Sequence, residues 1–208
     1  MPRADAGIRF REVMRGPFAL GESDPREGAR AGLRAGTELL LHASLSVPEV
    51  AQFASDSQHR GVLDGTIGFA PMASQLSVTD GAFQLFTRGP DGKLMVYRAT
   101  FAHRGAAYCF NGVKRLGAGG ILHSWKETTT LYSTLHSGAD PSGQVVGAGI
   151  LRLSPAALVR QLGTFAPVRC GRLSERARGF SRFLAFFAGE LIDTYVLHPF
   201  PQRRGVHD

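Results

Sequence analysis

Four side chains capable of proton transfer interrupt otherwise apolar segments of this chain. They comprise two carboxylates, one amine and one phenol. A carboxylate or an amine pushed into an apolar cavity has a shifted pKa and can act as a general acid or base. The candidate catalytic residues are Glu127, Asp64, Lys114 and Tyr108.

Aromatic and large aliphatic side chains surround these residues in the sequence. Small-molecule pockets are lined mostly by such side chains, with a few polar groups that orient the ligand. The candidate ligand-binding residues are Tyr97, Phe101, Phe110, Trp125 and Leu131. Together the two sets describe a mostly apolar cavity with a few fixed polar groups.

Alternation along two predicted strands sorts the candidates by face. Tyr108 and Lys114 share one face of the first strand, and Trp125 and Glu127 share one face of the next. The pattern leaves open which faces point inward. In the alternative reading, Lys114 and Glu127 pair across the strands at the surface, and Trp125 and Tyr108 are ordinary core or rim residues.

Strand patterns that must position these residues recur along most of the chain. Adjacent strands are joined by short turns such as Pro90-Asp91-Gly92 and Arg104-Gly105. The predicted strands cover residues 10–20 (ending near 16–17), 36–47, 59–70, 82–87, 94–103, 106–116, 122–136 and 143–153. This order predicts a mainly β fold, a closed antiparallel lipocalin-like (calycin-type) barrel of about eight strands. The interior of such a barrel is just wide enough for one small ligand.

Short flanking helices and a C-terminal helix complete the predicted fold. A short helix is expected after Pro48 and another over residues 155–162, whereas residues 21–34 read as an exposed loop or a marginal helix. Residues 174–196 carry apolar side chains at helical spacing and are expected to pack on the barrel. We expect one domain over residues 1–208, with loose ends at 1–8 and 199–208.

Composition excludes several classes of protein. No apolar run approaches the length that spans a bilayer, and the first residues lack the apolar core of a secretory signal, which predicts a cytoplasmic protein without stable membrane insertion. The net charge of +7 comes from arginines concentrated toward the two ends, mostly not interleaved with aromatic residues, which argues against nucleic-acid binding. Cys109 and Cys170 are expected to be free thiols.

Common catalytic and cofactor motifs are absent from the sequence. It contains no nucleophile elbow, P-loop, H-E-x-x-H or C-x-x-C. The seven histidines are scattered, and none lie two to four residues apart as a local metal pair would. Gly117-Ala118-Gly119-Gly120 joins two predicted strands, so we interpret it as a turn. No cofactor and no metal are therefore expected.

Several segments resemble a known family. They include His59-Arg60-Gly61, Phe110-Asn111-Gly112-Val113-Lys114 and, most specifically, the W-x-x-T-T-T-L element from Trp125 to Leu131. Over roughly residues 10–195 the order of motifs resembles the β-barrel module appended to bacterial flavin oxidoreductases of the glucose–methanol–choline type, which are cholesterol-oxidase-like. The resemblance implies a lipocalin-like barrel and a lipid- or steroid-like ligand. It carries over no catalytic residue, and the flavin-binding segment is absent.

Three functional hypotheses follow. The first is binding of a hydrophobic small molecule, of lipid, steroid, terpenoid or polyketide type, in the barrel. The second is a cofactor-free isomerase or cyclase that acts on such a substrate in the same cavity. The third is a structural partner subunit, in a homodimer or with a partner enzyme, that uses the apolar face of residues 180–195.

Overall fold

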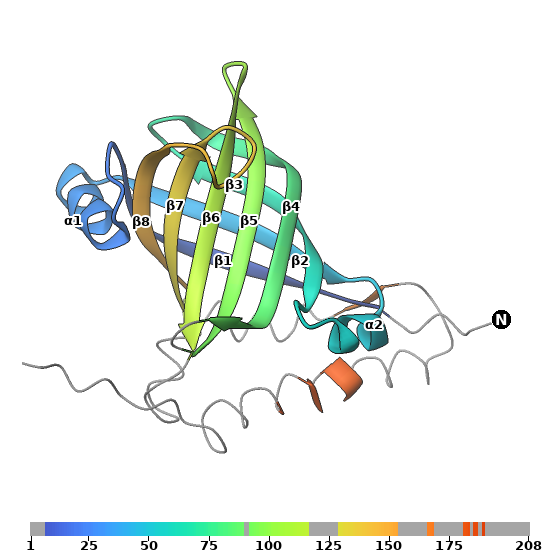
Figure 1. The fold of residues 1–208 in the computed structure, drawn as a ribbon. Helices are drawn as coiled ribbons and strands as arrows, with labels where there is room; N and C mark the ends of the chain where they lie inside the picture. The colour runs from blue at the N-terminus through green and yellow to red at the C-terminus, as the bar shows by residue number, and fades with distance from the viewer. Residues whose placement is uncertain are drawn as a thin grey trace, which may run out of the picture.

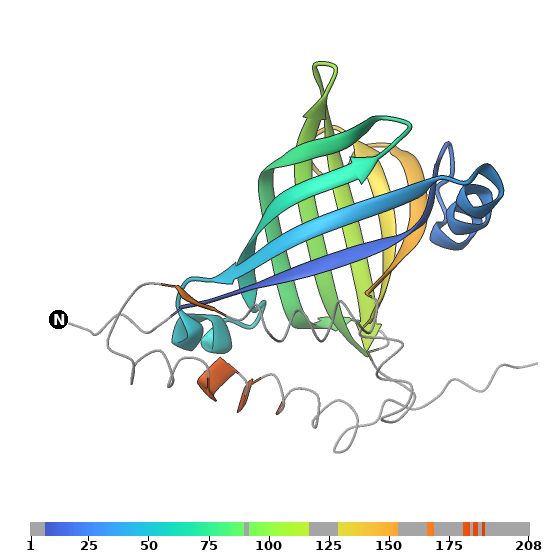
Figure 2. The same ribbon diagram turned by 180° about the vertical axis from the view of Figure 1, so that it is seen from behind.

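A computed structural model describes residues 7–89, 92–116, 129–153, 166–168, 181–183, 185–186 and 189. Eight antiparallel strands form a closed barrel, shown from two sides in Figures 1 and 2. The strands are β1 (Gly7–Leu20), β2 (Glu38–Val47), β3 (Arg60–Phe69), β4 (Ala73–Gly89), β5 (Gly92–His103), β6 (Ala106–Leu116), β7 (Thr130–Ser137) and β8 (Val145–Leu153). The predicted closed barrel is confirmed.

The first strand closes the barrel by pairing on both sides. Each strand from β2 to β7 pairs with its successor in the sequence, and β1 pairs with both β2 and β8. A short strand, β9 (Ala166–Val168), adds to β1 at residues 7–9, beyond the part of β1 that β8 reaches. The sequence reading did not include β9.

Pro17 does not end the first strand, contrary to the expectation that it stops near Gly16-Pro17. The ladder between β1 and β8 keeps one register from Met14↔Leu153 to Leu20↔Gly147, and only the positions at Gly16 and Pro17 lack a partner there. Proline cannot donate to a ladder, but a single gap does not stop a strand that is held by a second neighbour. On that other side Pro17 is still in register with Glu38 of β2.

Two further boundaries differ from the sequence reading. Gly7 and Ile8 were expected in a loose end, yet they belong to β1, and Ile8 is buried because it begins the inward row of that strand. The fourth strand was expected over residues 82–87 and extends over Ala73–Gly89, with register shifts that the regular alternation does not reveal. The expected helix at 155–162 and the tail at 199–208 lie outside the described residues.

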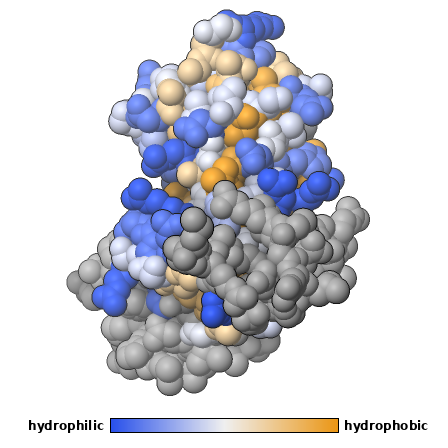
Figure 3. Space-filling view, turned by 90° about the vertical axis from the view of Figure 1, so that its right-hand side faces the viewer, coloured by the Kyte–Doolittle hydropathy of each residue, from blue (hydrophilic) through white to orange (hydrophobic). Residues whose placement is uncertain are grey.

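Alternation decides which side chains face the interior, the lumen of the barrel. In β2 the buried hydrophobic residues are Leu39, Leu41, Ala43, Leu45 and Val47. The outer surface is more polar: Figure 3 shows one face on which hydrophilic residues surround a narrow band of hydrophobic ones. Within the described segments the large hydrophobic residues that are exposed are Leu20, Leu33 and Val62.

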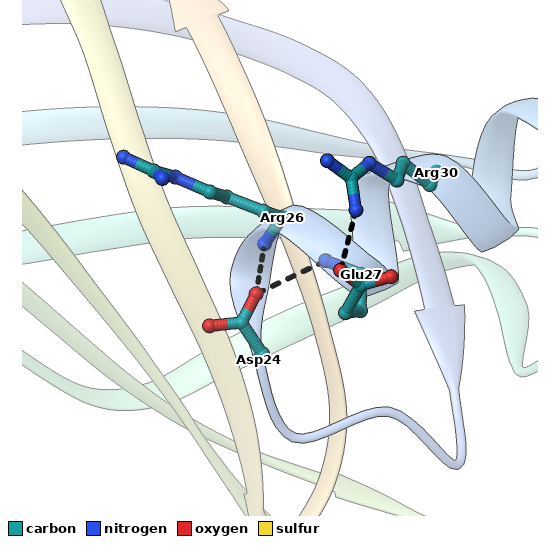
Figure 4. A network of polar contacts seen from close by, with 4 residues as sticks. All are labelled: Asp24, Arg26, Glu27 and Arg30. Carbon is teal, nitrogen blue, oxygen red and sulfur yellow. Dashed lines mark hydrogen bonds and ion pairs between the residues drawn. The ribbon is translucent and has the colours of Figure 1, made fainter. Parts of the chain in front are cut away.

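A helix outside the barrel, α1 (Pro25–Ala35), has well-defined ends. The carboxylate of Asp24 accepts hydrogen bonds from the backbone N–H groups of Arg26 (2.8 Å) and Glu27 (3.0 Å), and Glu27 pairs with Arg30 (Figure 4). These N-terminal hydrogen bonds lower the pKa of Asp24. Gly36 ends the helix in the left-handed conformation, at φ 65°. Residues 21–34 were interpreted as an exposed loop or a marginal helix, and these caps show that most of the segment is a helix.

The helix α1 docks on the barrel through glycines. A Cβ atom added to Gly28 would lie 2.1 Å from the carbonyl oxygen of Ala148 in β8, and one added to Gly32 would lie 2.4 Å from the backbone nitrogen of Phe18 in β1. The backbone of the helix thus touches the backbone of both closing strands. Such contact needs little apolar surface, so a helix of low hydrophobicity can pack there.

Replacing Gly28 by alanine is expected to destabilise the protein, although alanine is the better helix former. The clash with Ala148 would cost about 1–3 kcal/mol, as overpacking usually does, against a gain of at most about 1 kcal/mol in helix propensity. Urea unfolding measures the difference. Leu33→Ala on the exposed face of the same helix is the control, with a change within about 0.5 kcal/mol. A more stable Gly28→Ala variant would contradict the close contact.

The opposite end of the barrel is closed by aromatic side chains. Phe53 of the helix α2 (Val50–Ser55) and Phe183, in the helical residues 181–183, lie there with Phe10 of β1. The ring centroid of Phe183 lies 6.0 Å from that of Phe10 and 6.3 Å from that of Phe53. We call this group, with Phe83, Phe86 and Phe186, the aromatic cluster. Among the residues described for 174–196, packing on the barrel is therefore observed.

A bulge in β4 supplies one member of the aromatic cluster. The register between β4 and β5 shifts between Gln84 and Thr87, and Phe86 adopts a φ of 53°. The left-handed region is unusual for a bulky residue. As a result Leu85 and Phe86 are both buried although they are consecutive, and Phe86 reaches Phe186 with ring centroids 6.0 Å apart.

No helix among the described residues is long and apolar enough to cross a membrane.

Candidate functional site in the barrel lumen

Three polar side chains meet inside the barrel near the aromatic cluster. Glu12 projects from β1, Tyr97 from β5 and Lys114 from β6, and their exposed fractions are 5%, 1% and 2%. We call them the polar triad. In the closed barrel β1 and β5 lie on opposite sides, because three strands separate them in either direction around the circle. The polar triad therefore spans the lumen.

Hydrogen bonds and charge link the polar triad. Lys114 Nζ donates to the Tyr97 hydroxyl at 3.0 Å and lies 3.5 Å from Glu12 Oε2. The same ammonium lies 4.8 Å from the centroid of the Tyr97 ring. The Tyr97 hydroxyl is also hydrogen-bonded to the Glu12 carboxylate. One carboxylate, one ammonium and one phenol thus form a connected set.

Burial raises the pKa of Tyr97 well above its usual value of 10.0, and the nearby negative charge of Glu12 raises it further. Ionising this phenol would place a second negative charge beside the carboxylate, away from water. Tyr97 therefore stays protonated and remains a hydrogen-bond donor throughout the neutral range.

The titration of Tyr97 is expected to appear only when the protein unfolds. Below pH 10 the phenol is protonated in both states, so its full contribution to stability is present; above pH 10 the unfolded chain ionises and the native protein does not, so stability falls as pH rises. Absorbance at 295 nm for the wild type and Tyr97→Phe measures this. The two curves should differ only in the alkaline unfolding transition. A reversible extra ionisation near pH 10 in the native wild type would count against it.

Apolar side chains enclose the polar triad on both sides along the barrel. Toward the aromatic cluster the next inward residues are Phe10, Met95 and Leu116, which are 4%, 3% and 1% exposed. In the other direction Ala99 follows Tyr97 on the inner face of β5, and the registers of β6 to β8 place the small residues Gly112, Ser133 and Gly149 in one row beside Tyr97. Leu131 lies over Gly112 and Phe18 over Gly149. The small residues of the wall thus accommodate large neighbours.

The structure brings together only some of the residues predicted from the sequence. Lys114 and Tyr97 belong to the polar triad, and neither the predicted role of Lys114 nor that of Tyr97 is tested by this placement. Leu131 is buried in the lumen against Gly112, close to the polar triad. Phe101 and Phe110 are buried farther along, and the half-buried Tyr108 stacks on Phe101 with ring centroids 5.8 Å apart.

Asp64 lies apart from these residues. It is exposed on the outer face of β3, opposite Ser44 of β2, because the inward positions of β3 are those of Leu63 and Ile67. The prediction that Asp64 lies in the same apolar cavity as Lys114 is therefore wrong. Glu127 and Trp125 lie outside the described residues.

The inward orientation of Lys114 also removes the alternative of a surface lysine. Its partner in the structure is Glu12, a residue that the sequence reading did not single out. A signal was available: Glu12 occupies the same alternating row as Phe10, Met14 and Phe18, all of which are buried. A carboxylate in an otherwise apolar row of a strand indicates a buried partner of opposite charge.

Outside the polar triad, a buried cysteine and a pocket on the outer surface also carry polar groups. Cys109 is a free, buried thiol whose pKa is raised by burial. Among the described residues no group of three or more His, Cys, Asp or Glu side chains could hold a metal ion. A pocket of about 350 Å³ on the outer face of β3 to β5 is lined by Arg60, Gln84 and Arg98 together with Ala82 and Val96. Because Arg60, Ala82 and Arg98 are exposed, this pocket offers no enclosed chemistry.

Fold and site together define a closed eight-stranded antiparallel barrel with a buried ion pair and a phenol in its lumen. No family model matches the chain, and no curated protein and no solved structure matches it either. The resemblance to the barrels of glucose–methanol–choline flavin oxidoreductases therefore stays a prediction.

Proposed function

We propose that the barrel binds a hydrophobic small molecule of lipid, steroid, terpenoid or polyketide type in its lumen, with the polar triad as the anchor for a polar group of that molecule. The observation that carries the proposal is the buried pair of Glu12 and Lys114. Removing two charges from water costs several kcal/mol per ion, and apolar residues of similar volume often give equal or greater stability. A role in ligand recognition accounts for the retention of the pair.

The surroundings of the polar triad support the ligand class. Met95, Leu116 and Leu131 lie on the same inner wall as Lys114 and are nearly fully buried. A ligand beside Lys114 would contact apolar side chains over most of its surface and one ammonium at a single point. This is the usual composition of small-molecule sites.

A matched pair of variants in β5 tests the proposal. Ala99 is fully buried in the lumen, and Ala102 of the same strand is exposed. Native mass spectrometry of the purified wild type is expected to show one retained hydrophobic molecule, or saturable uptake of decan-1-ol after delipidation. Ala99→Leu fills space beside the polar triad and should abolish uptake, whereas Ala102→Leu should preserve it.

Two outcomes would refute lumen binding. One is a delipidated, folded wild type that takes up no decan-1-ol and no fluorescent apolar probe. The other is undiminished uptake by a folded Ala99→Leu variant, which would place binding outside the lumen. Circular dichroism confirms that each variant is folded, and the result for the wild type decides the case if Ala99→Leu does not fold.

Contact between an acid and a base in the lumen favours a second candidate function, a cofactor-free isomerase or cyclase. The protonated Tyr97 can donate to a developing oxyanion while the Glu12 carboxylate takes a proton from the substrate. Tyr97→Phe and Glu12→Gln should each lower turnover about 10²–10⁴-fold, the usual contribution of a general acid or base. Unchanged turnover of a substrate in both variants would eliminate this candidate.

A further inference from the structure

The amine of Lys114 combines three properties that suit it to covalent capture of a carbonyl compound. The Lys114 side chain is only 2% exposed. Its Nζ atom lies 3.5 Å from the Glu12 carboxylate and is hydrogen-bonded to the Tyr97 hydroxyl. Proteins use lysines in apolar surroundings as amine nucleophiles toward carbonyl compounds. The carboxylate supplies a base for the ammonium and a counter-charge for a cationic product.

We propose that Lys114 forms a Schiff base with a hydrophobic aldehyde in the lumen, with Glu12 as proton acceptor and counter-ion and Tyr97 as a positioning residue. This inference rests on the proposed function, because the aldehyde must first enter the barrel. It adds the chemical class of the ligand and the bond that holds it.

The reaction balances without any further reactant. Glu12 accepts one proton from the Lys114 ammonium, and the free electron pair of the amine attacks the carbonyl carbon. The carbinolamine then loses its oxygen as water, which carries away two of the three ammonium protons. The third proton stays on the nitrogen of the iminium product, whose positive charge replaces that of the ammonium beside Glu12.

The polar triad suits the product as well as the reactant. The iminium nitrogen would lie close to where Lys114 Nζ now lies, within reach of the Glu12 carboxylate. A buried cation requires such a partner, since isolated charges are strongly disfavoured in an apolar interior. The Tyr97 hydroxyl, kept protonated by its surroundings, orients the lysine side chain before the reaction.

Reductive trapping tests the bond directly. The full chain is incubated with decanal and sodium cyanoborohydride, and the modified peptides are mapped by mass spectrometry. The chain has only three lysines, Lys93, Lys114 and Lys126, so the assignment is unambiguous. We expect labelling of Lys114 to exceed that of the other two by about tenfold or more, because the barrel holds the aldehyde next to the amine.

Matched ligands and variants separate the inference from the proposed function. Decan-1-ol has the same chain and cannot form a Schiff base, so it reports lumen binding alone. Lys114→Arg keeps a positive charge beside Glu12 and should lose the trapped adduct, because a guanidinium does not take the place of the amine that attacks the aldehyde. Glu12→Gln should slow trapping at Lys114 about tenfold or more, in keeping with loss of a general base.

The remaining outcomes overturn either the Schiff base alone or lumen binding together with it. Uptake of decan-1-ol without trapping of decanal at Lys114 would overturn the Schiff base and leave lumen binding intact. Equal labelling of all three lysines, as in the protein unfolded in urea, would also overturn it. Failure to take up decan-1-ol would overturn the proposed function and this inference with it.

Discussion

Lys114→Met is expected to lower the free energy of unfolding by about 3–5 kcal/mol, the usual cost of leaving one member of a buried ion pair without its counter-charge. The loss comes from Glu12, which is 5% exposed and would lie in the lumen without the ammonium that is now 3.5 Å away. Urea unfolding of the two proteins measures the difference.

The double variant Glu12→Met/Lys114→Met makes the test specific. Because both charges are absent, it should recover most of the lost stability, and replacements of this kind can even exceed the wild type. The surface pair Arg15–Glu38 is the control: its side chains are 69% and 55% exposed, and Glu38→Ala should cost at most about 1 kcal/mol. A double variant as unstable as Lys114→Met would show that the charges do not act as a pair.

Phe183→Ala is expected to cost about 3–5 kcal/mol, as truncation of a buried phenylalanine usually does. The Phe183 ring is 1% exposed and packs against both Phe10 of the barrel and Phe53 of α2. Its removal would open the aromatic cluster at the end of the lumen nearest the polar triad. Chemical denaturation measures the cost, and release of bound decan-1-ol measures the opening.

Phe18→Ala provides the matched comparison at the far end of the barrel. Phe18 is fully buried against Phe69, with ring centroids 5.3 Å apart, so its truncation should cost a similar amount of stability. We expect faster release of decan-1-ol from Phe183→Ala than from Phe18→Ala. Equal release rates would mean that the aromatic cluster does not control access.

The barrel was predictable because its signal is local and repeated. Leu39, Leu41, Ala43, Leu45 and Val47 alternate in the sequence and all face the lumen in the structure. Short turns between successive strands then leave an antiparallel barrel as the arrangement that removes exposed edges. The same alternation predicted which side chains of β6 share a face, including Tyr108 and Lys114.

The composition of the site was less predictable, because it depends on contacts across the lumen. Lys114 was singled out as a rare residue, but its partner Glu12 comes from β1, a strand that does not pair with β6. Alternation states which residues share a face and not which residues meet across the barrel. Asp64 was misassigned for the same reason: a single carboxylate in a strand can point into the barrel or out to solvent, and Asp64 points outward.

The packing of α1 was not predictable from hydrophobicity. Gly28 and Gly32 were part of a segment interpreted as having little to bury, whereas their missing side chains permit backbone contact with the barrel. A glycine in a helix reads as a loss of helix propensity. Its value for close approach becomes visible only once the neighbouring strand is in place.

Closure through β1 has a consequence for how the protein is made. The ladder that completes the barrel joins Met14 to Leu153, so the ribosome must add nearly all of the strands before the first one finds its second neighbour. At ordinary rates of translation the growing sheet keeps an open edge for roughly ten seconds. Pairing between residues so distant in the sequence is also slow. The finished eight-stranded ring has no open edge, which by itself would indicate little dependence on folding conditions. Because the edge stays open during synthesis, the yield of folded protein should nevertheless depend strongly on temperature and chaperone supply.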